Sequence, residues 1–325
     1  MSYNHLLYSG GKIETIINQA EINKRLQELQ KIKQEKEIIL NVKKAYYSAL
    51  KAKELLKIAE EEVNYAEKYL EITKAKFKEG KIPEIEVRKS KISLANSKEE
   101  YNSAKNVYTF AMLGLNLILG VELDKEYELL EDTAYSPIDI TYEKALNTAL
   151  NERLEIKEMF LTKELAKLGI KLANSQNKPN IALSGSYNLT GDKYPPDIKS
   201  WAIGIGLNYP FYDSGETSSK IKQARCNLNQ QEIAEEETKK QITYEVKQLW
   251  LKLKEIEEKI NVLQETLKEA EKTKEITEIR YKEGLASSIE VYEAALLYKK
   301  AKVSYISSIY DHKIAKAELE KAMGK

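Results

Sequence analysis

The side chains that carry out most enzyme chemistry are scarce in this chain of 325 residues. Cys226 is the only cysteine, so the chain forms no internal disulfide and is not expected to hold a cysteine-based metal site. His5 and His312, the only histidines, lie far apart in the sequence, which favours ordinary structural roles for both. No glycine-rich phosphate loop, nucleophile motif or pair of carboxylates in a cleft pattern occurs. The sequence predicts no enzyme, no cofactor and no metal.

Charge is abundant but balanced. Charged residues make up 32% of the chain, with 52 basic and 51 acidic side chains interleaved along it. Such mixed runs are typical of solvated helix faces, and only 6 prolines interrupt the chain. Because no basic stripe forms, we expect no nucleic-acid partner.

The elements that carry these residues are organised as a tandem repeat. Residues 7–120 align without a gap on residues 211–324, at a constant offset of 204, so that Gly80 matches Gly284. Units of this length are far longer than solenoid repeats. The sequence therefore predicts a duplicated helical hairpin.

Each copy begins with a long stretch free of proline and glycine. Its apolar residues recur at alternating spacings of three and four, which is the pattern of a coiled-coil seam. The pattern predicts helices over residues 11–79 and 215–283, each roughly 100 Å long. Gly80 and Gly284 are expected to end them in the left-handed conformation.

Shorter return helices follow the two glycines. Pro83 suits the first position of one, which should end near Leu119. Ser287 and Glu290 have the spacing of a capping box at the start of the other, over residues 288–322.

The repeat suggests three regions. We expect a first repeat over residues 1–120 with its tip near 80–83, a connector over residues 121–140, and a second repeat over residues 141–325 with its tip near 284–287. In the second repeat, residues 142–174 read as one helix.

The patterning changes to period two at about residues 181–189 and 201–211. Trp201, Ile203 and Ile205 alternate with small residues, and residues 191–196 form a loop between the two segments. This pattern is typical both of a transmembrane β-strand and of an amphipathic hairpin on a soluble domain. Two strands placed between very long helices favour the membrane interpretation.

The order of these motifs resembles the TolC family of outer-membrane efflux proteins. The resemblance rests on a Trp-led strand ending at residues 209–215, a long helix, the tip at residues 280–284 and the step at residues 289–294. It covers essentially the whole chain, and the duplicated tip is its most specific part.

The resemblance implies a mainly α fold. Long antiparallel coiled-coil hairpins would form an α-barrel tunnel, and a small β portion would contribute to a trimeric outer-membrane β-barrel. It implies a homotrimeric duct in the outer membrane and periplasm that works with a periplasmic adaptor (membrane fusion) protein and an inner-membrane pump. Such a duct serves tripartite efflux or type I secretion, exporting small molecules or proteins. Outer-membrane lipid would surround it.

By comparison with the second repeat, the first begins late, at about Leu6. We expect a signal peptide, a helix and most of two strands to precede it, about 100 residues by analogy with the family. The alternatives are a soluble coiled-coil scaffold, or a non-functional truncated remnant of such a channel.

The resemblance also implies site residues at the hairpin tips. A periplasmic gate would include Glu86, Glu290, Glu293 and Tyr281, and a trimer would gather six carboxylates from Glu86 and Glu290. Locally, both acids also suit the first turn of a helix. The expected tip and adaptor-docking residues are Phe77, Gly80, Lys81, Gly284 and Leu285. Ala286 stands where the best-known member has a latching arginine, so any lock must use other contacts.

Overall fold

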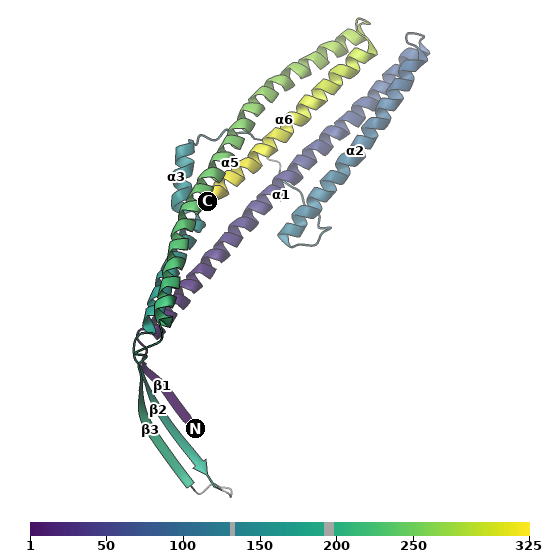
Figure 1. The fold of residues 1–325 in the computed structure, drawn as a ribbon. Coiled ribbons are helices and arrows are strands. Elements are labelled where there is room, and N and C mark those ends of the chain that lie inside the picture. Colours follow the sequence, from purple (N-terminus) through teal and green to yellow (C-terminus); the bar gives the residue numbers. More distant parts are fainter. Residues whose placement is uncertain (131–133, 192–197) are drawn as a thin grey trace. The chain divides into compact units, whose positions relative to one another are not determined.

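The computed structural model describes residues 1–130, 134–191 and 198–325, and it is dominated by two helical hairpins (Figure 1). The first consists of α1 (Lys12–Lys78) and α2 (Glu84–Leu119), and the second of α5 (Glu216–Lys282) and α6 (Ser288–Ala322). Helices α1 and α5 have 67 residues each, which corresponds to roughly 100 Å. The expected long helices are confirmed. Among the described helices, none combines the length and the apolar character required to cross a membrane.

Both hairpins turn at the expected glycines. Gly80 and Gly284 adopt φ values of 70° and 76°, the left-handed region in which glycine carries no steric penalty. The capping box of α6 is confirmed, because Ser287 and Glu290 exchange both hydrogen bonds. Pro83 stands one position earlier than expected: it is the N-cap of α2, with extended backbone, and Glu84 is the first helical residue.

The prediction of a single helix over residues 142–174 is wrong. The segment contains α3 (Tyr142–Glu152) and α4 (Leu154–Ser175), separated by Arg153 in an extended conformation. The Arg153 side chain is buried and donates to both carboxylate oxygens of Glu155 at 3.1 Å. The break allows the guanidinium of Arg153 to pair with Glu155 in the first turn of α4. The apolar periodicity of the segment does not reveal this break.

The sheet has three antiparallel strands in the order β1-β2-β3. They are β1 (Ser2–Tyr8), β2 (Asn180–Thr190) and β3 (Ile198–Asn208). The last strand begins and ends three residues before the expected 201–211, and Pro210, which lacks an N–H, lies beyond it. The first strand starts at Ser2 and not near Leu6, since its main chain pairs with β2 from Ser2 onward. Apart from Gly191, the loop expected at 191–196 lies outside the described residues.

The same turn connects a strand to a long helix in both repeats. Gly10 and Gly11 have φ values of 63° and 86°, and their counterparts Ser214 and Gly215 have 55° and 86°. The side chain before each pair caps the helix: Ser9 Oγ accepts from the Ile13 N–H, and Asp213 accepts from Thr217 and Gly215. The duplication therefore extends to backbone geometry.

Gly10 has less room for a side chain than Gly11. A Cβ added at Gly10 would lie 2.5 Å from the Lys178 Cβ, whereas one at Gly11 would meet nothing within 4 Å. We expect Gly10→Ala to lower the free energy of unfolding by about 1–2 kcal/mol more than Gly11→Ala, because both carry backbone strain but only the first clashes. Urea unfolding followed by circular dichroism measures this difference. Equal losses would contradict the clash.

The chain divides into two compact units. One contains Met1–Gln34 and Leu150–Thr243, and the other contains Glu35–Ala149 and Tyr244–Lys325. Helices α1 and α5 contribute to both units, so the units cut across the sequence repeat.

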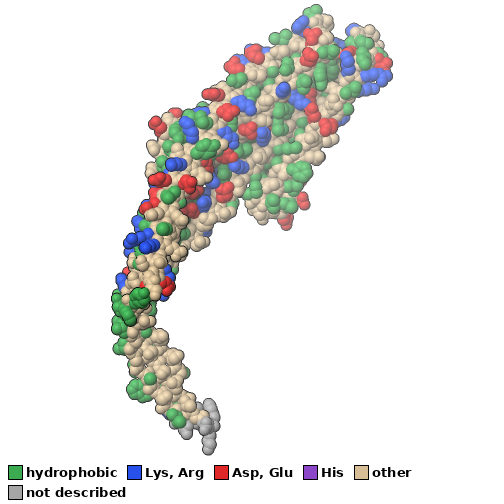
Figure 2. All heavy atoms as spheres, in the orientation of Figure 1, with side chains coloured by type: hydrophobic (Ala, Val, Ile, Leu, Met, Phe, Trp, Pro, Cys, Tyr) green, Lys and Arg blue, Asp and Glu red, His purple; other side chains and the backbone are tan. Residues whose placement is uncertain are grey.

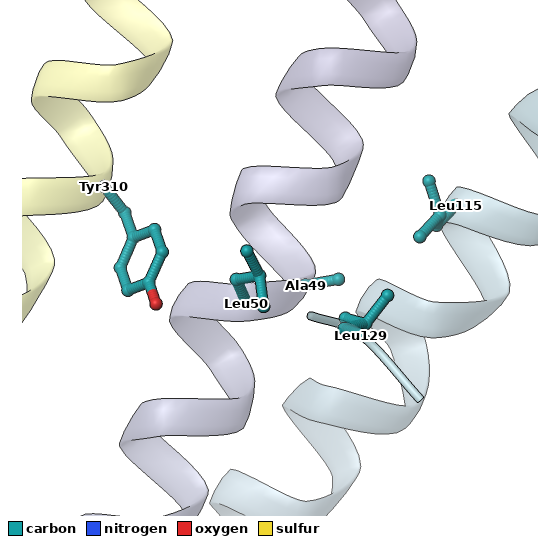
Figure 3. Close-up of a cluster of buried hydrophobic side chains, with 5 residues drawn as sticks. All are labelled: Ala49, Leu50, Leu115, Leu129 and Tyr310. Carbon is teal, nitrogen blue, oxygen red and sulfur yellow. The ribbon is translucent and has the colours of Figure 1, made fainter. Parts of the chain in front are cut away.

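The second unit contains a buried apolar cluster formed by Ala49, Leu50, Leu115, Leu129 and Tyr310. Figure 3 shows Leu50 of α1 facing Tyr310 of α6, with Leu115 of α2 on the other side. This cluster joins both hairpins to the connector that follows α2.

A row of ion pairs runs along α1 and α6 within the same unit. Lysines of α1 pair with acidic residues of α6 over the middle of the row, and the charges are exchanged at its ends. The pairs are Glu37–Lys321, Lys43–Glu320, Lys44–Glu318, Lys51–Asp311 and Glu61–Lys302.

Candidate functional site: the hairpin tips

The two hairpins contact each other near their tips, within the second unit. Glu86, in the first turn of α2, accepts a hydrogen bond from the Ser288 hydroxyl at the start of α6. It also accepts from Lys89 at 3.0 Å. These hydrogen bonds, first that of Ser288, lower the pKa of Glu86. The expected gate residue is therefore an ionised carboxylate that ties one hairpin to the other.

Glu290 has a different environment. Its Oε1 accepts from the Ser287 N–H at 3.0 Å and from the Ser287 hydroxyl at 2.9 Å. The backbone hydrogen bond is the first cause of its lowered pKa. In the single chain, Glu290 has the local role of a helix-capping acid.

The aromatic tip residues of the two repeats are not equivalent. Phe77 is 42% exposed, whereas its counterpart Tyr281 is only 9% exposed. The Lys76 ammonium lies 3.7 Å from the centre of the Tyr281 ring. The centres of the Tyr69 and Tyr281 rings are 6.1 Å apart. Lys76 also donates to the Tyr281 carbonyl at 3.3 Å. Tyr281 therefore packs against the first hairpin, and Phe77 faces outward.

The other predicted tip residues are exposed. Leu285 is 69% exposed, and Glu293 is exposed in the second turn of α6. Lys81 pairs with Glu79 at 2.8 Å. The structure thus brings Glu86 and Tyr281 into the contact between hairpins and leaves Glu293, Phe77 and Lys81 on the surface.

A cleft of about 210 Å³ opens beside the Glu86–Ser288 contact. Its walls come from α1, α2 and α6 and include Tyr69, Ser90, Asn96 and Tyr292. The Tyr69 hydroxyl donates to the Ser288 carbonyl at 3.4 Å. Sequence reasoning missed Tyr69, Lys76 and Ser288. The only available signal was the spacing of Tyr65 and Tyr69 on one helix face.

The strands offer a second functional surface. Paired residues of β2 and β3 put the apolar side chains on one face, as Leu183 with Ile205 and Tyr187 with Trp201 show. The other face carries small residues, and Ser184 pairs there with Gly204. On the side shown in Figure 2, charged side chains are spread over the helices among hydrophobic ones, whereas the strands show hydrophobic and other uncharged atoms.

The apolar face of β3 is largely unprotected in the single chain. Trp201, Ile203, Ile205 and Leu207 are 68–75% exposed, and Phe211 and Tyr212 beyond the strand are more exposed still. A continuous apolar stripe with aromatic residues at its end matches the outer surface of a strand that faces lipid.

These hairpins and strands are those of a known family. Residues 2–121 and 145–325 match the family model described as outer membrane efflux protein, so the chain belongs to this family. Curated relatives include outer membrane protein TolC of Vibrio cholerae, which is 24% identical over 88% of this chain and 67% of its own length. TolC of Escherichia coli is 20% identical over 88% of this chain. The chain spans 61–67% of the length of the curated relatives it matches.

Solved structures share the fold. The outer membrane protein VceC of Vibrio cholerae superposes with a TM-score of 0.83 at 16% identity, covering 99% of this chain and 78% of VceC. The CmeC outer membrane channel of Campylobacter jejuni has a TM-score of 0.79 at 20% identity, covering 99% and 69%. The expected fold class, long helical hairpins with a small β portion, is confirmed. CmeC is one of the matched structures that are described as outer membrane channels.

Proposed function

We propose that this chain forms the outer-membrane duct of a tripartite efflux or type I secretion system. As a homotrimer it works with a periplasmic adaptor and an inner-membrane pump, and it exports small molecules or proteins across the periplasm and outer membrane. The proposal rests on one observation above the others: a sheet with one apolar face belongs to the same chain as two hairpins with helices of 67 residues. A soluble scaffold has no use for such a sheet.

The tips supply the gate in this proposal. Glu86, Glu290 and Glu293 provide acidic side chains at the constriction, and Tyr281 anchors one hairpin against the other. Ala286 leaves no arginine latch, so the Glu86–Ser288 hydrogen bond and the Lys76–Tyr281 contact hold the hairpins together instead. Phe77, Lys81 and Leu285 lie exposed at the tips beside the two glycines and are available to an adaptor.

Conductance in a planar lipid bilayer tests both the duct and its gate. We expect the full chain to form cation-selective pores that a trivalent cation blocks, since several close carboxylates bind multiply charged ions best. The double variant Glu86→Gln/Glu290→Gln should weaken this block several-fold and lower the selectivity. Reversal potentials in a salt gradient and titration of the block measure both effects.

A matched pair of acids provides the control. Glu71 and Glu275 occupy equivalent positions in the two repeats, and both are exposed on the long helices, more than two turns before the tip glycines. Glu71→Gln/Glu275→Gln removes the same charge and should leave the block unchanged. Equal block in the tip variant and the original chain would remove Glu86 and Glu290 from the gate. A complete lack of pores would favour the scaffold.

A further inference from the structure

The segment of residues 134–140, called here the connector segment, is fastened to α5 by three side chains. Glu257 Oε1 accepts from the Ile138 N–H at 2.9 Å, and Lys254 donates to the Ile138 carbonyl at 3.1 Å. Lys254 also donates to Glu257 Oε2 at 2.7 Å. Seven residues earlier in α5 than Glu257, Trp250 Nε1 donates to the Ile140 carbonyl at 3.0 Å. Main-chain groups of this segment are therefore held by α5.

A buried histidine, His312, contacts the same glutamate, Glu257. His312 of α6 is 3% exposed, and its Nε2 lies 3.4 Å from Glu257 Oε1, the oxygen that also holds Ile138. The Tyr135 ring covers the imidazole edge-on, with ring centres 5.0 Å apart. Glu257 is itself only 7% exposed. His312, Glu257 and the connector segment thus form one buried contact.

The charges around His312 disfavour its protonation. Burial is the first cause that lowers its pKa, Lys313 and Lys316 of α6 act in the same direction, and Glu257 opposes them. On the α5 side, the ammonium group of Lys254 lies beside Glu257. Burial raises the pKa of Glu257, but the hydrogen bonds from Lys254 and Ile138 outweigh it and leave that pKa lowered.

The phenol of Tyr135, which lies over the His312 ring, is titratable as well. Tyr135 of the connector segment has a raised pKa, first because it is buried and then because of Glu257 and Tyr305. Tyrosine is therefore neutral here throughout the range in which a histidine titrates. Among His312, Glu257 and Tyr135, a proton taken up between pH 5 and 8 therefore belongs to His312.

We propose that Glu257, Lys254 and His312 form an acid-released clamp, which holds the connector segment against α5 and α6 while His312 is neutral and frees it when His312 gains a proton. A buried imidazolium needs hydration, and the single carboxylate beside it already accepts from Lys254 and Ile138. Water reaches the ring when Tyr135 moves away, and Tyr135 belongs to the connector segment. Release therefore accompanies protonation.

The direction of the pH dependence follows from the lowered pKa. A histidine whose pKa is lower in the folded state than its ordinary value of 6.5 stabilises that state above pH 6.5. This contribution is lost as the pH falls through the folded-state pKa. The clamp is closed at neutral pH and opens in acid.

Trp250 reports on the clamp directly, because its indole binds the last residue of the connector segment. The chain has only 2 tryptophans, so Trp201→Phe leaves Trp250 as the sole fluorophore. We expect the emission of the full chain in detergent to shift to longer wavelength between pH 8 and pH 5. Quenching by acrylamide should rise about twofold, with a midpoint below pH 6.5. No change over this range would overturn the proposal.

Variants in the same background assign the transition. His312→Gln and His312→Phe both remove the titrating ring, and the transition should disappear in whichever retains the helical circular dichroism signal. His5→Gln, which removes the only other histidine, should leave it unchanged. Glu257→Gln should give the acid form of the spectrum already at pH 8. A persisting transition in either folded His312 variant, or its loss in His5→Gln, would refute the clamp.

Discussion

Replacing Leu50 with alanine is expected to lower the free energy of unfolding by about 2–5 kcal/mol. Leu50 is 1% exposed and belongs to the apolar cluster in which α1, α6 and the connector meet (Figure 3). The truncation removes apolar contact with several elements at once, and rigid helices on either side cannot collapse into the space. Urea unfolding at neutral pH, followed at 222 nm, measures the loss.

Leu251 supplies the matched control. It is a leucine on a long helix of the same unit, but it is 51% exposed. Its replacement by alanine should change the stability by no more than about 0.5 kcal/mol. Similar losses for the two variants would show that the cluster around Leu50 is not the centre of this unit.

Replacing Ile205 with arginine is expected to reduce membrane insertion sharply. Ile205 lies in the middle of the apolar face of β3 and is 72% exposed in the single chain. If that face contacts lipid, as the proposed function requires, a charge near the midplane costs about 2–4 kcal/mol. Flotation with phospholipid vesicles, compared with the original chain, should show a loss of the bound fraction of tenfold or more.

The opposite face of the same strand provides the comparison. Ala202 lies among the small residues on the other face of β3 and pairs with Ser186. Ala202→Arg should insert far better than Ile205→Arg. If the two variants float equally, or if Ala202→Arg is the worse, the assignment of the faces is wrong.

The sequence predicted most of what depends on local chemistry. Gly80 and Gly284 end their helices because the left-handed turn is free of strain only for glycine, and Ser287 caps α6 through a pattern that extends over four residues. These signals depend only on a few neighbouring residues, and the repeat contains the helix-ending glycine twice. The helices between them follow from unbroken seams.

What the sequence could not predict depends on contacts between distant segments. Arg153 interrupts a helix whose pattern is continuous, and Glu86 reaches Ser288 across 202 positions. Tyr281 and Phe77 occupy equivalent positions in the repeat, yet one is buried and the other is not. Repetition predicts equal local structure, but each copy has different neighbours, and the neighbours decide burial.

The ion pairs between α1 and α6 have a consequence for how two such long helices find their alignment. Along α1, the row begins with the negative charge of Glu37, continues with three lysines and ends with the negative charge of Glu61. A slip of one heptad in one direction places Lys44 opposite Lys321, and a slip in the other places Glu37 opposite Glu318. Each exposed pair alone adds little stability. Together they penalise the misaligned states, which coiled-coil seams with a regular repeat would otherwise tolerate. The row of ion pairs therefore favours a single axial register of α1 against α6.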